Sequence, residues 1–111
     1  MKRGDIYFAQ LDPTRGSEIQ KTRPVVIVSN DVANRASSLV TIVPLSSNVS
    51  RVFPFEVPLT ADQSGFPKDS KAMAQQIRTI DKSRLSRQRS GHLKPKQLTA
   101  LDEALRLHLG L

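Results

Sequence analysis

Short apolar segments with the two-residue period of β-strands fill most of the chain before its C-terminal basic region. The segment Asp5–Leu11 alternates apolar with polar residues, which predicts a first strand. The run Val25–Val28 contains only valine and isoleucine, so we expect Pro24–Ser29 to form a strand buried on both faces. A third apolar strand is predicted over Leu39–Leu45, just before a cluster of small polar residues.

Shorter strand-like segments follow. The segment 55–59 alternates and includes Pro58, which cannot donate to a β-ladder and therefore predicts an edge strand. Strands are also predicted over Lys71–Ala74 and Gln76–Ile80, separated by a bulge near Gln75. Several short strands at such close spacing predict a small β-barrel, so the expected fold class is mainly β (α+β).

The C-terminal pattern is that of a helix. Pro95 stands where a first helical turn tolerates proline, and Gly110 stands where a helix ends. His108 falls within the apolar stripe of this helix, so we expect a packed histidine. A single helical turn is also predicted over Asp31–Ala36, with Asn30 as its N-cap. The apolar stripe consists of Leu98, Leu101, Leu105 and Leu109.

Length and composition predict one soluble domain over residues 1–111. The chain has no cysteine, which excludes disulfides and thiolate metal sites and favours a reducing, cytoplasmic location. No apolar run approaches the roughly 20 residues that span a membrane, and no apolar signal region follows Met1. His92 and His108 are isolated and the acidic residues are scattered singly, so we expect neither a metal nor a cofactor.

The net charge of +7 is unevenly distributed. Residues 82–111 hold seven basic and two acidic side chains, hence +5, whereas residues 37–81 hold four of each. Between Lys82 and Lys96 there are six cations and no anion. Such a tract favours a polyanion, either nucleic acid or an acidic peptide, although a solvated basic face remains an alternative.

A polar loop with Glu18 and Lys21 runs directly into the buried second strand at Arg23. Pro24 restricts the backbone after Arg23, so its guanidinium is expected to be aimed by a rigid element. A cation held in this way suits a phosphate or a developing oxyanion. The alternative is that Arg23 caps the loop and pairs with Glu18 at the surface.

Four pieces of sequence occur in an order that resembles the MazF/PemK family of toxin endoribonucleases. They are Lys2-Arg-Gly-Asp-Ile-Tyr-Phe8, the segment from Gly16 to Asp31, Asn34, and Gln75-Gln-Ile-Arg-Thr-Ile-Asp81. The resemblance runs from residue 2 to the C-terminus. It implies an SH3-like barrel with a C-terminal helix, a fold shared with the CcdB-type gyrase poisons. It also implies a homodimer that binds RNA in a groove across the subunit interface.

The activity that the resemblance implies is metal-independent, sequence-specific cleavage of single-stranded RNA. Attack by the 2′-hydroxyl of the RNA itself would leave a 2′,3′-cyclic phosphate and a 5′-hydroxyl. The implied partner is an antitoxin whose acidic, disordered tail occupies the same groove. Two rival functions are a non-catalytic gyrase-poison-like toxin and a basic RNA-binding module, which would leave Arg23 dispensable.

The family's catalytic pair, an arginine after the first loop and a threonine or serine after the third strand, falls on Arg23 and Ser46. Arginine is too basic to accept the proton, so Arg23 is expected to clamp the phosphate while Ser46 donates a hydrogen bond. Glu18 is the candidate proton acceptor, with water or the leaving group as alternatives. Some relatives carry an acid where this chain has Gln75, which excludes acid–base chemistry at that position.

Other polar residues around this centre are expected to contact RNA through phosphates or base edges. Phe53 is expected either to stack on a base or to serve as a lid of the barrel. The expected polar contacts are Arg15, Lys21, Asn34, Arg51, Gln76 and Arg78.

Overall fold

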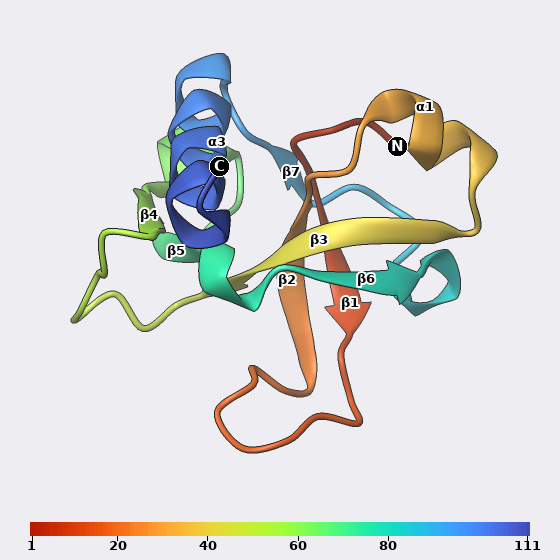
Figure 1. Ribbon diagram of the computed structural model, residues 1–111, viewed down its shortest axis with the longest axis horizontal. Coiled ribbons are helices and arrows are strands. Elements are labelled where there is room, and N and C mark those ends of the chain that lie inside the picture. Colours follow the sequence, from red (N-terminus) through yellow and green to blue (C-terminus); the bar gives the residue numbers. More distant parts are fainter.

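One strongly bent antiparallel sheet forms the body of the computed structural model, which describes residues 1–111, and helix α3 (Pro95–Leu109) covers one of its faces (Figure 1). The strands are β1 (Asp5–Gln10), β2 (Thr22–Ile27), β3 (Leu39–Ser46), β4 (Glu56–Leu59), β5 (Ser70–Met73), β6 (Arg78–Asp81) and β7 (Gly91–His92). The remaining elements are helices α1 (Asp31–Ala36) and α2 (Ala61–Ser64) and the 3-10 turns η1 (Ala74–Gln76) and η2 (Lys82–Arg84). The predicted class, mainly β with a C-terminal helix, is confirmed.

Strand β3 joins the two parts of the sheet. The strand order is β4-β5-β3-β2-β1-β7, and β6 pairs with β3 outside this path. Residues 39–42 of β3 pair with β6 and residues 42–44 with β2, whereas Leu45 and Ser46 pair with Ala72 and Lys71 of β5. β3 therefore pairs with different strands along its length. β4, which contains Pro58, lies at an edge as predicted.

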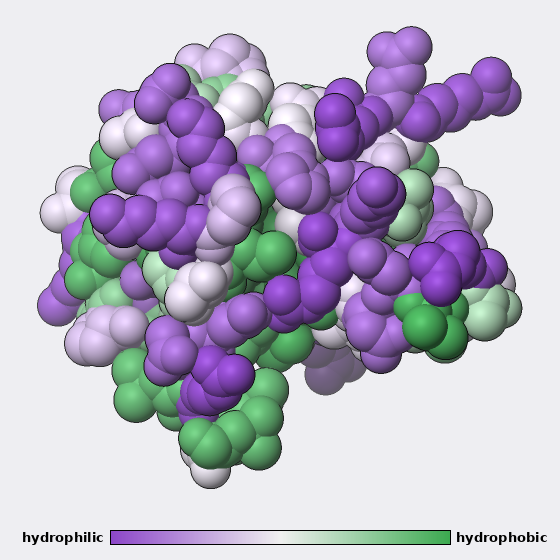
Figure 2. All heavy atoms as spheres, turned by 90° about the horizontal axis from the view of Figure 1, so that it is seen from above, coloured by the Kyte–Doolittle hydropathy of each residue, from purple (hydrophilic) through white to green (hydrophobic).

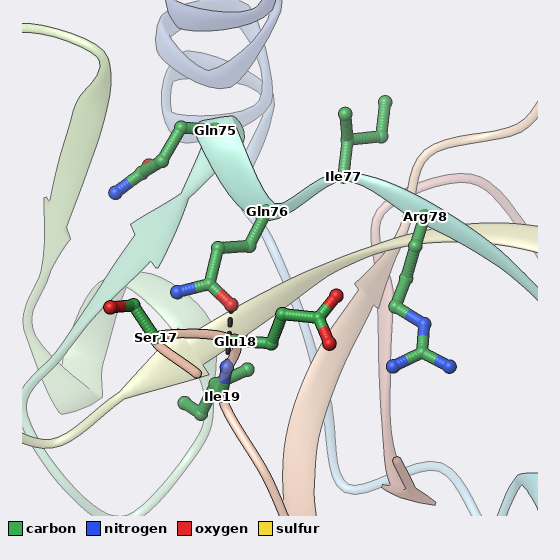
Figure 3. Close-up of a pocket in the computed structure, with 7 residues that line it drawn as sticks. All are labelled: Ser17, Glu18, Ile19, Gln75, Gln76, Ile77 and Arg78. Atoms are coloured by element: carbon green, nitrogen blue, oxygen red, sulfur yellow. Dashed lines mark hydrogen bonds between the residues drawn. The ribbon is translucent and has the colours of Figure 1, made fainter. Parts of the chain in front are cut away.

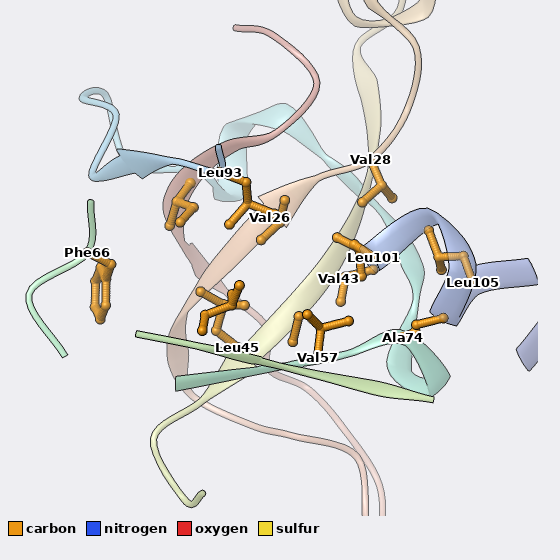
Figure 4. Packing of buried hydrophobic residues seen from close by; sticks show 14 residues of the cluster. Val26, Val28, Val43, Leu45, Val57, Phe66, Ala74, Leu93, Leu101 and Leu105 are labelled. Atoms are coloured by element: carbon orange, nitrogen blue, oxygen red, sulfur yellow. The ribbon is translucent and has the colours of Figure 1, made fainter. Parts of the chain in front are cut away.

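Alternation along the strands builds two apolar clusters on opposite faces of the sheet. In β3, Val43 and Leu45 belong to the cluster under α3, and Val40 and Ile42 belong to the other. The first cluster packs sheet residues against the buried side of α3 (Figure 4). Each fully buried side chain of this size contributes about 1.5–3 kcal/mol relative to exposure. The second cluster lines the face that faces away from α3 and consists of Tyr7, Ala9, Leu11, Val25, Ile27, Val40, Ile42 and Ile80.

The end of α3 departs from the predicted stripe. Leu101, Ala104 and Leu105 are buried, but Leu109 is 50% exposed, so its predicted core position is wrong. His108 is exposed as well, although its ring centre lies 6.3 Å from that of Phe55. The last turn of α3 lies beyond the apolar cluster that its first turns cover. The periodicity continues, but the surface that it would pack against does not.

Two local features also differ from the prediction. In place of a bulge near Gln75, the chain makes the 3-10 turn η1, and β6 starts only at Arg78. The turn α2 was not predicted, although its capping box is readable as a threonine followed three residues later by glutamine. In this box the Thr60 hydroxyl accepts from the Gln63 N–H and the Gln63 side chain accepts from the Thr60 N–H. The helical turn α1 and its N-cap Asn30 are confirmed.

Most cations of the basic tract hold neighbouring segments of the protein in place. The Arg84 guanidinium donates to the carbonyls of Gln10 (3.0 Å) and Asp12 (2.7 Å). Arg87 and Lys96 make no hydrogen bond or ion pair within the protein. Seen from above, the surface is mostly hydrophilic, with long side chains extending from it and hydrophobic residues in separate patches (Figure 2). The tract residues with internal partners are Lys82, Arg84, Arg89 and Lys94.

Candidate active site

Arg23 and Ser46 lie on neighbouring strands, just beyond the residues that pair β2 with β3. The β2–β3 register ends at Val25 opposite Pro44; Arg23 stands two residues before Val25, and Ser46 stands two residues after Pro44. Because side chains two apart in a strand share a face, both residues follow the face that carries Val25. The register therefore places the two residues expected to form the catalytic pair on the same face of the sheet, at the ends of neighbouring strands. Their catalytic roles remain a prediction.

Arg23 is half-buried and its charge has no carboxylate partner. Its Nε donates to the Gln20 carbonyl at 3.0 Å, which fixes the guanidinium against the end of the β1–β2 loop. The alternative pairing with Glu18 is not formed, since a Glu18 carboxylate oxygen accepts instead from the Arg15 N–H at 2.5 Å. An unneutralised, positioned guanidinium is available to an incoming phosphate.

A small hollow of about 160 Å³ lies beside Arg23. It adds a second cation, Lys68, together with the hydroxyl-bearing residues Thr22, Ser47 and Ser70. Lys68 makes no hydrogen bond or ion pair through its side chain within the protein. Sequence reasoning missed Lys68 because it lies far along the chain in a turn, and no local pattern connects it to Arg23. The remaining lining residues are Phe8, Pro24, Leu45 and Phe66.

Glu18 lies in a different and larger cavity of about 430 Å³ (Figure 3). One wall is the β1–β2 loop and the other is η1 with the start of β6. The Glu18 carboxylate lies between the side chains of Gln76 and Arg78, whereas Gln75 points away from them. The structure therefore groups Glu18 with Gln76 and Arg78, and neither Arg23 nor Ser46 lines this cavity. The full lining is Ser17, Glu18, Ile19, Gln75, Gln76, Ile77 and Arg78.

The loop that carries Glu18 is fastened along its length. The Gln76 side-chain oxygen accepts from the Ile19 N–H at 2.6 Å, the bond drawn in Figure 3. An Arg78 guanidinium nitrogen donates to the Leu11 carbonyl at 3.2 Å, next to the carbonyls that Arg84 holds. Gln76 and Arg78 thus support the loop in addition to any contact with substrate.

Asn34 does not fit its expected role. It is only 3% exposed, and its amide nitrogen donates to the Ser29 carbonyl at 2.8 Å. The Asn34 side-chain oxygen also accepts from the Ser29 hydroxyl. The expectation of direct RNA contact by Asn34 is therefore corrected: its side chain fixes the junction between β2 and α1. Arg15 and Lys21 are exposed, and their side chains make no hydrogen bond or ion pair.

Arg51 and Phe53 lie on the exposed loop between β3 and β4. The Arg51 guanidinium carbon is 4.8 Å from the centre of the Phe53 ring, a cation–π geometry. In Figure 1 this loop extends to the left of the sheet, whereas the β1–β2 loop extends to the bottom of the view. Phe53 is 37% exposed and does not act as a lid over either apolar cluster.

The structure has no group of three or more His, Cys, Asp or Glu residues arranged to hold a metal ion. None of its helices has the length and apolar character needed to cross a bilayer.

The fold agrees with what comparison with known proteins shows. Residues 2–109 match the profile of the PemK-like, MazF-like toxins of type II toxin–antitoxin systems. This chain is 47% identical to endoribonuclease MazF9 of Mycobacterium tuberculosis, over 100% of this chain and 98% of that protein. It is 39% identical to endoribonuclease EndoA of Bacillus subtilis, over 100% and 96% of the two chains. The chain therefore belongs to the PemK/MazF toxin family.

Solved structures give the same assignment. A mycobacterial endoribonuclease in complex with its cognate antitoxin superposes with a TM-score of 0.81 at 27% identity, covering 100% of this chain and 96% of that one. MazF from Deinococcus radiodurans superposes with a TM-score of 0.85 over 100% of this chain and 97% of that chain. At 24% identity, this second match supports the fold alone.

Proposed function

We propose that this chain is the endoribonuclease toxin of a type II toxin–antitoxin pair and cuts single-stranded RNA at specific sequences. The observation that carries the proposal is Arg23, a positioned cation without a carboxylate partner, on the same face as Ser46. The 47% identity to a named endoribonuclease over the whole chain supports it. Messenger RNA as substrate places the toxin in the cytoplasm.

The proposed mechanism uses the RNA as its own nucleophile. The 2′-oxygen attacks the adjacent phosphorus, the bond to the 5′-oxygen breaks, and a 2′,3′-cyclic phosphate and a 5′-hydroxyl result. Arg23 holds the non-bridging oxygens, and the Ser46 hydroxyl donates to the same phosphate. In this scheme Glu18 takes the proton of the 2′-hydroxyl, and the departing 5′-oxygen takes a proton from water. Gln75 contributes no acid–base step.

The partners in this proposal are a second copy of the chain and an antitoxin. A solved mycobacterial endoribonuclease, 27% identical to this chain, is in complex with its cognate antitoxin. We infer that the homodimer forms the RNA groove and that the acidic tail of the cognate antitoxin fills it. Sedimentation equilibrium of the purified chain tests the dimer.

The decisive experiment is cleavage of a long unstructured RNA by the purified chain with excess EDTA. We expect cutting at unchanged rate, and resistance of RNA that carries 2′-deoxy or 2′-O-methyl groups at the mapped cut sites. Complete dependence on added magnesium would contradict attack by the 2′-hydroxyl. Binding without cutting would instead favour an RNA-binding module, and no action on RNA would favour a gyrase poison of the same fold.

A further inference from the structure

The loop between β3 and β4 presents a stack of flat side chains to solvent. The Phe53 and Phe55 rings are parallel within 8°, with centres 5.3 Å apart. The Arg51 guanidinium lies over Phe53, and its charge has no carboxylate partner. His108 of α3 approaches Phe55 from the helix side at 6.3 Å. We call Arg51, Phe53 and Phe55 the stacking arm.

A buried ion pair holds the main chain of this arm. Lys71 and Glu56 are 8% and 5% exposed, and their Nζ and Oε1 atoms are 3.0 Å apart. The same Nζ donates to the Arg51 carbonyl at 2.7 Å. The same Oε1 accepts from the Phe53 N–H at 3.0 Å. The two members of the pair thus each fix one backbone group of the arm.

The same network reaches the cavity that contains Glu18. The Gln75 amide nitrogen donates to the second Glu56 carboxylate oxygen at 2.7 Å. Gln75 and its neighbour Gln76 both line the cavity, and Gln76 holds the β1–β2 loop through the Ile19 N–H. The neighbouring residues Gln75 and Gln76 of η1 therefore each hold one of the two loops of the site, Gln75 through Glu56 and Gln76 through Ile19.

The energetics of the buried pair indicate that this network positions the stacking arm rather than adding to the free energy of unfolding. Burial opposes the ionisation of Glu56, but hydrogen bonds from the Phe53 N–H, Gln75 and Lys71 outweigh it and hold the pKa below the usual 4.5. A buried ion pair is nevertheless a weak source of net stability, because desolvation offsets most of the attraction. What such a pair supplies is a fixed arrangement of the groups bonded to it.

Resting on the proposed function, we propose that the stacking arm binds an unpaired nucleobase of the RNA substrate and that Glu56, Lys71 and Gln75 are its positioning residues. Every base has a π-face that stacks on aromatic rings or on guanidinium planes, and the Arg51 charge also attracts the adjacent phosphate. An acidic peptide would use only the charge. The paired flat groups therefore favour RNA over the antitoxin as the occupant.

A double-mutant cycle tests the proposal by separating positioning from general stability. The arm is removed with Arg51→Ala and Phe53→Ala together, and the network is perturbed with Glu56→Gln, alone and combined with the first pair. The matched control is Glu103→Gln, the same chemical change in the exposed pair with Arg106. Affinity is measured by fluorescence anisotropy on a labelled 2′-O-methyl single-stranded RNA of mixed sequence, and kcat and KM on a long cleavable RNA.

Removing the arm should weaken RNA binding about tenfold or more, the range measured for loss of one base stack. Glu56→Gln should raise KM severalfold while kcat stays within about twofold, and Glu103→Gln should change neither. With the arm absent, Glu56→Gln should add no further loss of affinity. An equal loss in both backgrounds would overturn the positioning role.

One further outcome would contradict the proposal. If the arm variant binds RNA as tightly as wild type and loses only antitoxin, the arm belongs to the antitoxin interface.

If Glu56→Gln fails to fold, Gln75→Met removes a single bond of the network and enters the same cycle. Because anisotropy reports binding without cleavage, failure of the arm is distinguishable from absence of nuclease activity.

Discussion

Arg23 enters the reaction with a charge that pH does not remove. An arginine side chain stays protonated throughout the physiological pH range. Its role in phosphate chemistry is therefore electrostatic, and its effect on the rate depends on how precisely the guanidinium is positioned. The Gln20 carbonyl, the strand β2 and Pro24 together restrict that position.

Replacing Arg23 should reduce catalysis more than binding. Loss of one preorganised donor to a developing charge costs roughly 2.7–4 kcal/mol, so Arg23→Ala should lower kcat a hundred- to thousandfold. Arg35 on α1 is exposed and has no side-chain partner, so Arg35→Ala is the matched control and should keep full activity. Single-turnover cleavage by folded protein is the measurement. Normal turnover by Arg23→Ala would place the active site elsewhere.

The same assay ranks Ser46 and Glu18. The Ser46 hydroxyl accepts from the Asn48 N–H at 3.2 Å, which leaves its proton free to donate. Ser46→Ala should cost less than Arg23→Ala, and Ser46→Thr should keep nearly full activity because the hydroxyl remains. Glu18→Gln should lower the rate with unchanged RNA affinity if Glu18 is the base. An unchanged rate would restrict Glu18 to shaping the cavity with Arg78.

At the scale of elements, the short strand β7 is fastened to β1 by Asp5. Asp5 lies opposite His92 in the β1–β7 register, and one carboxylate oxygen accepts from His92 Nδ1 at 2.6 Å and from Arg89 at 3.3 Å. The other oxygen accepts from the Lys2 N–H at 2.8 Å. Burial alone would raise the pKa of Asp5, but these donors outweigh burial and hold it below 3.8.

These contacts of the Asp5 carboxylate should make the free energy of unfolding depend on pH in the acid range. A carboxyl whose folded pKa lies below its unfolded value of about 3.9 stabilises the protein above that pH and loses the contribution as pH falls through the folded pKa. Asp5→Asn should cost about 1.5–3 kcal/mol at pH 7, lowering Tm by roughly 10 °C. Thermal unfolding between pH 3 and pH 7 should then show a smaller loss on acidification than wild type.

The exposed carboxylate of Asp62 provides the control for this experiment. Asp62→Asn changes the same group at a surface ion pair of 3.6 Å, so Tm and its pH dependence should stay close to wild type. If Asp5→Asn and wild type lose stability in parallel between pH 5 and pH 3, the acid sensitivity arises elsewhere.

The sequence predicted elements best where one local rule decides them. The run Val25–Val28 and the turn capped by Asn30 follow from composition and spacing alone. Leu109 was misplaced because periodicity does not show where a helix passes the edge of the cluster below it. Of the site, Arg23 could be read from the polar loop that enters a buried strand, whereas Ser46 came from the family resemblance. The pair of Glu56 with Lys71 was not predictable, because buried partners distant in sequence look like ordinary surface charges.

At the scale of the whole molecule, the net charge of +7 favours two competing polyanions. We expect a non-cleavable RNA and the acidic tail of the antitoxin to exclude one another, because both require Arg23. Long-range attraction should make the association rate of the tail fall as salt rises, more than its final contacts weaken. Stopped-flow association and competition anisotropy measure the two effects. Simultaneous binding of both ligands would show that inhibition acts from a distance.

The hydrogen bonds that Arg78 and Arg84 donate to the main chain of the β1–β2 loop affect how such a toxin can change its target during evolution. Arg78 and Arg84 hold main-chain carbonyls of Gln10, Leu11 and Asp12, and these carbonyls remain whatever side chains the loop carries. Residues between 13 and 20, apart from Glu18, can therefore vary without losing this anchorage. The side chains of the loop therefore do not determine how its main chain is held. A loop grafted from a relative should take up the same position and bring its own preference for RNA.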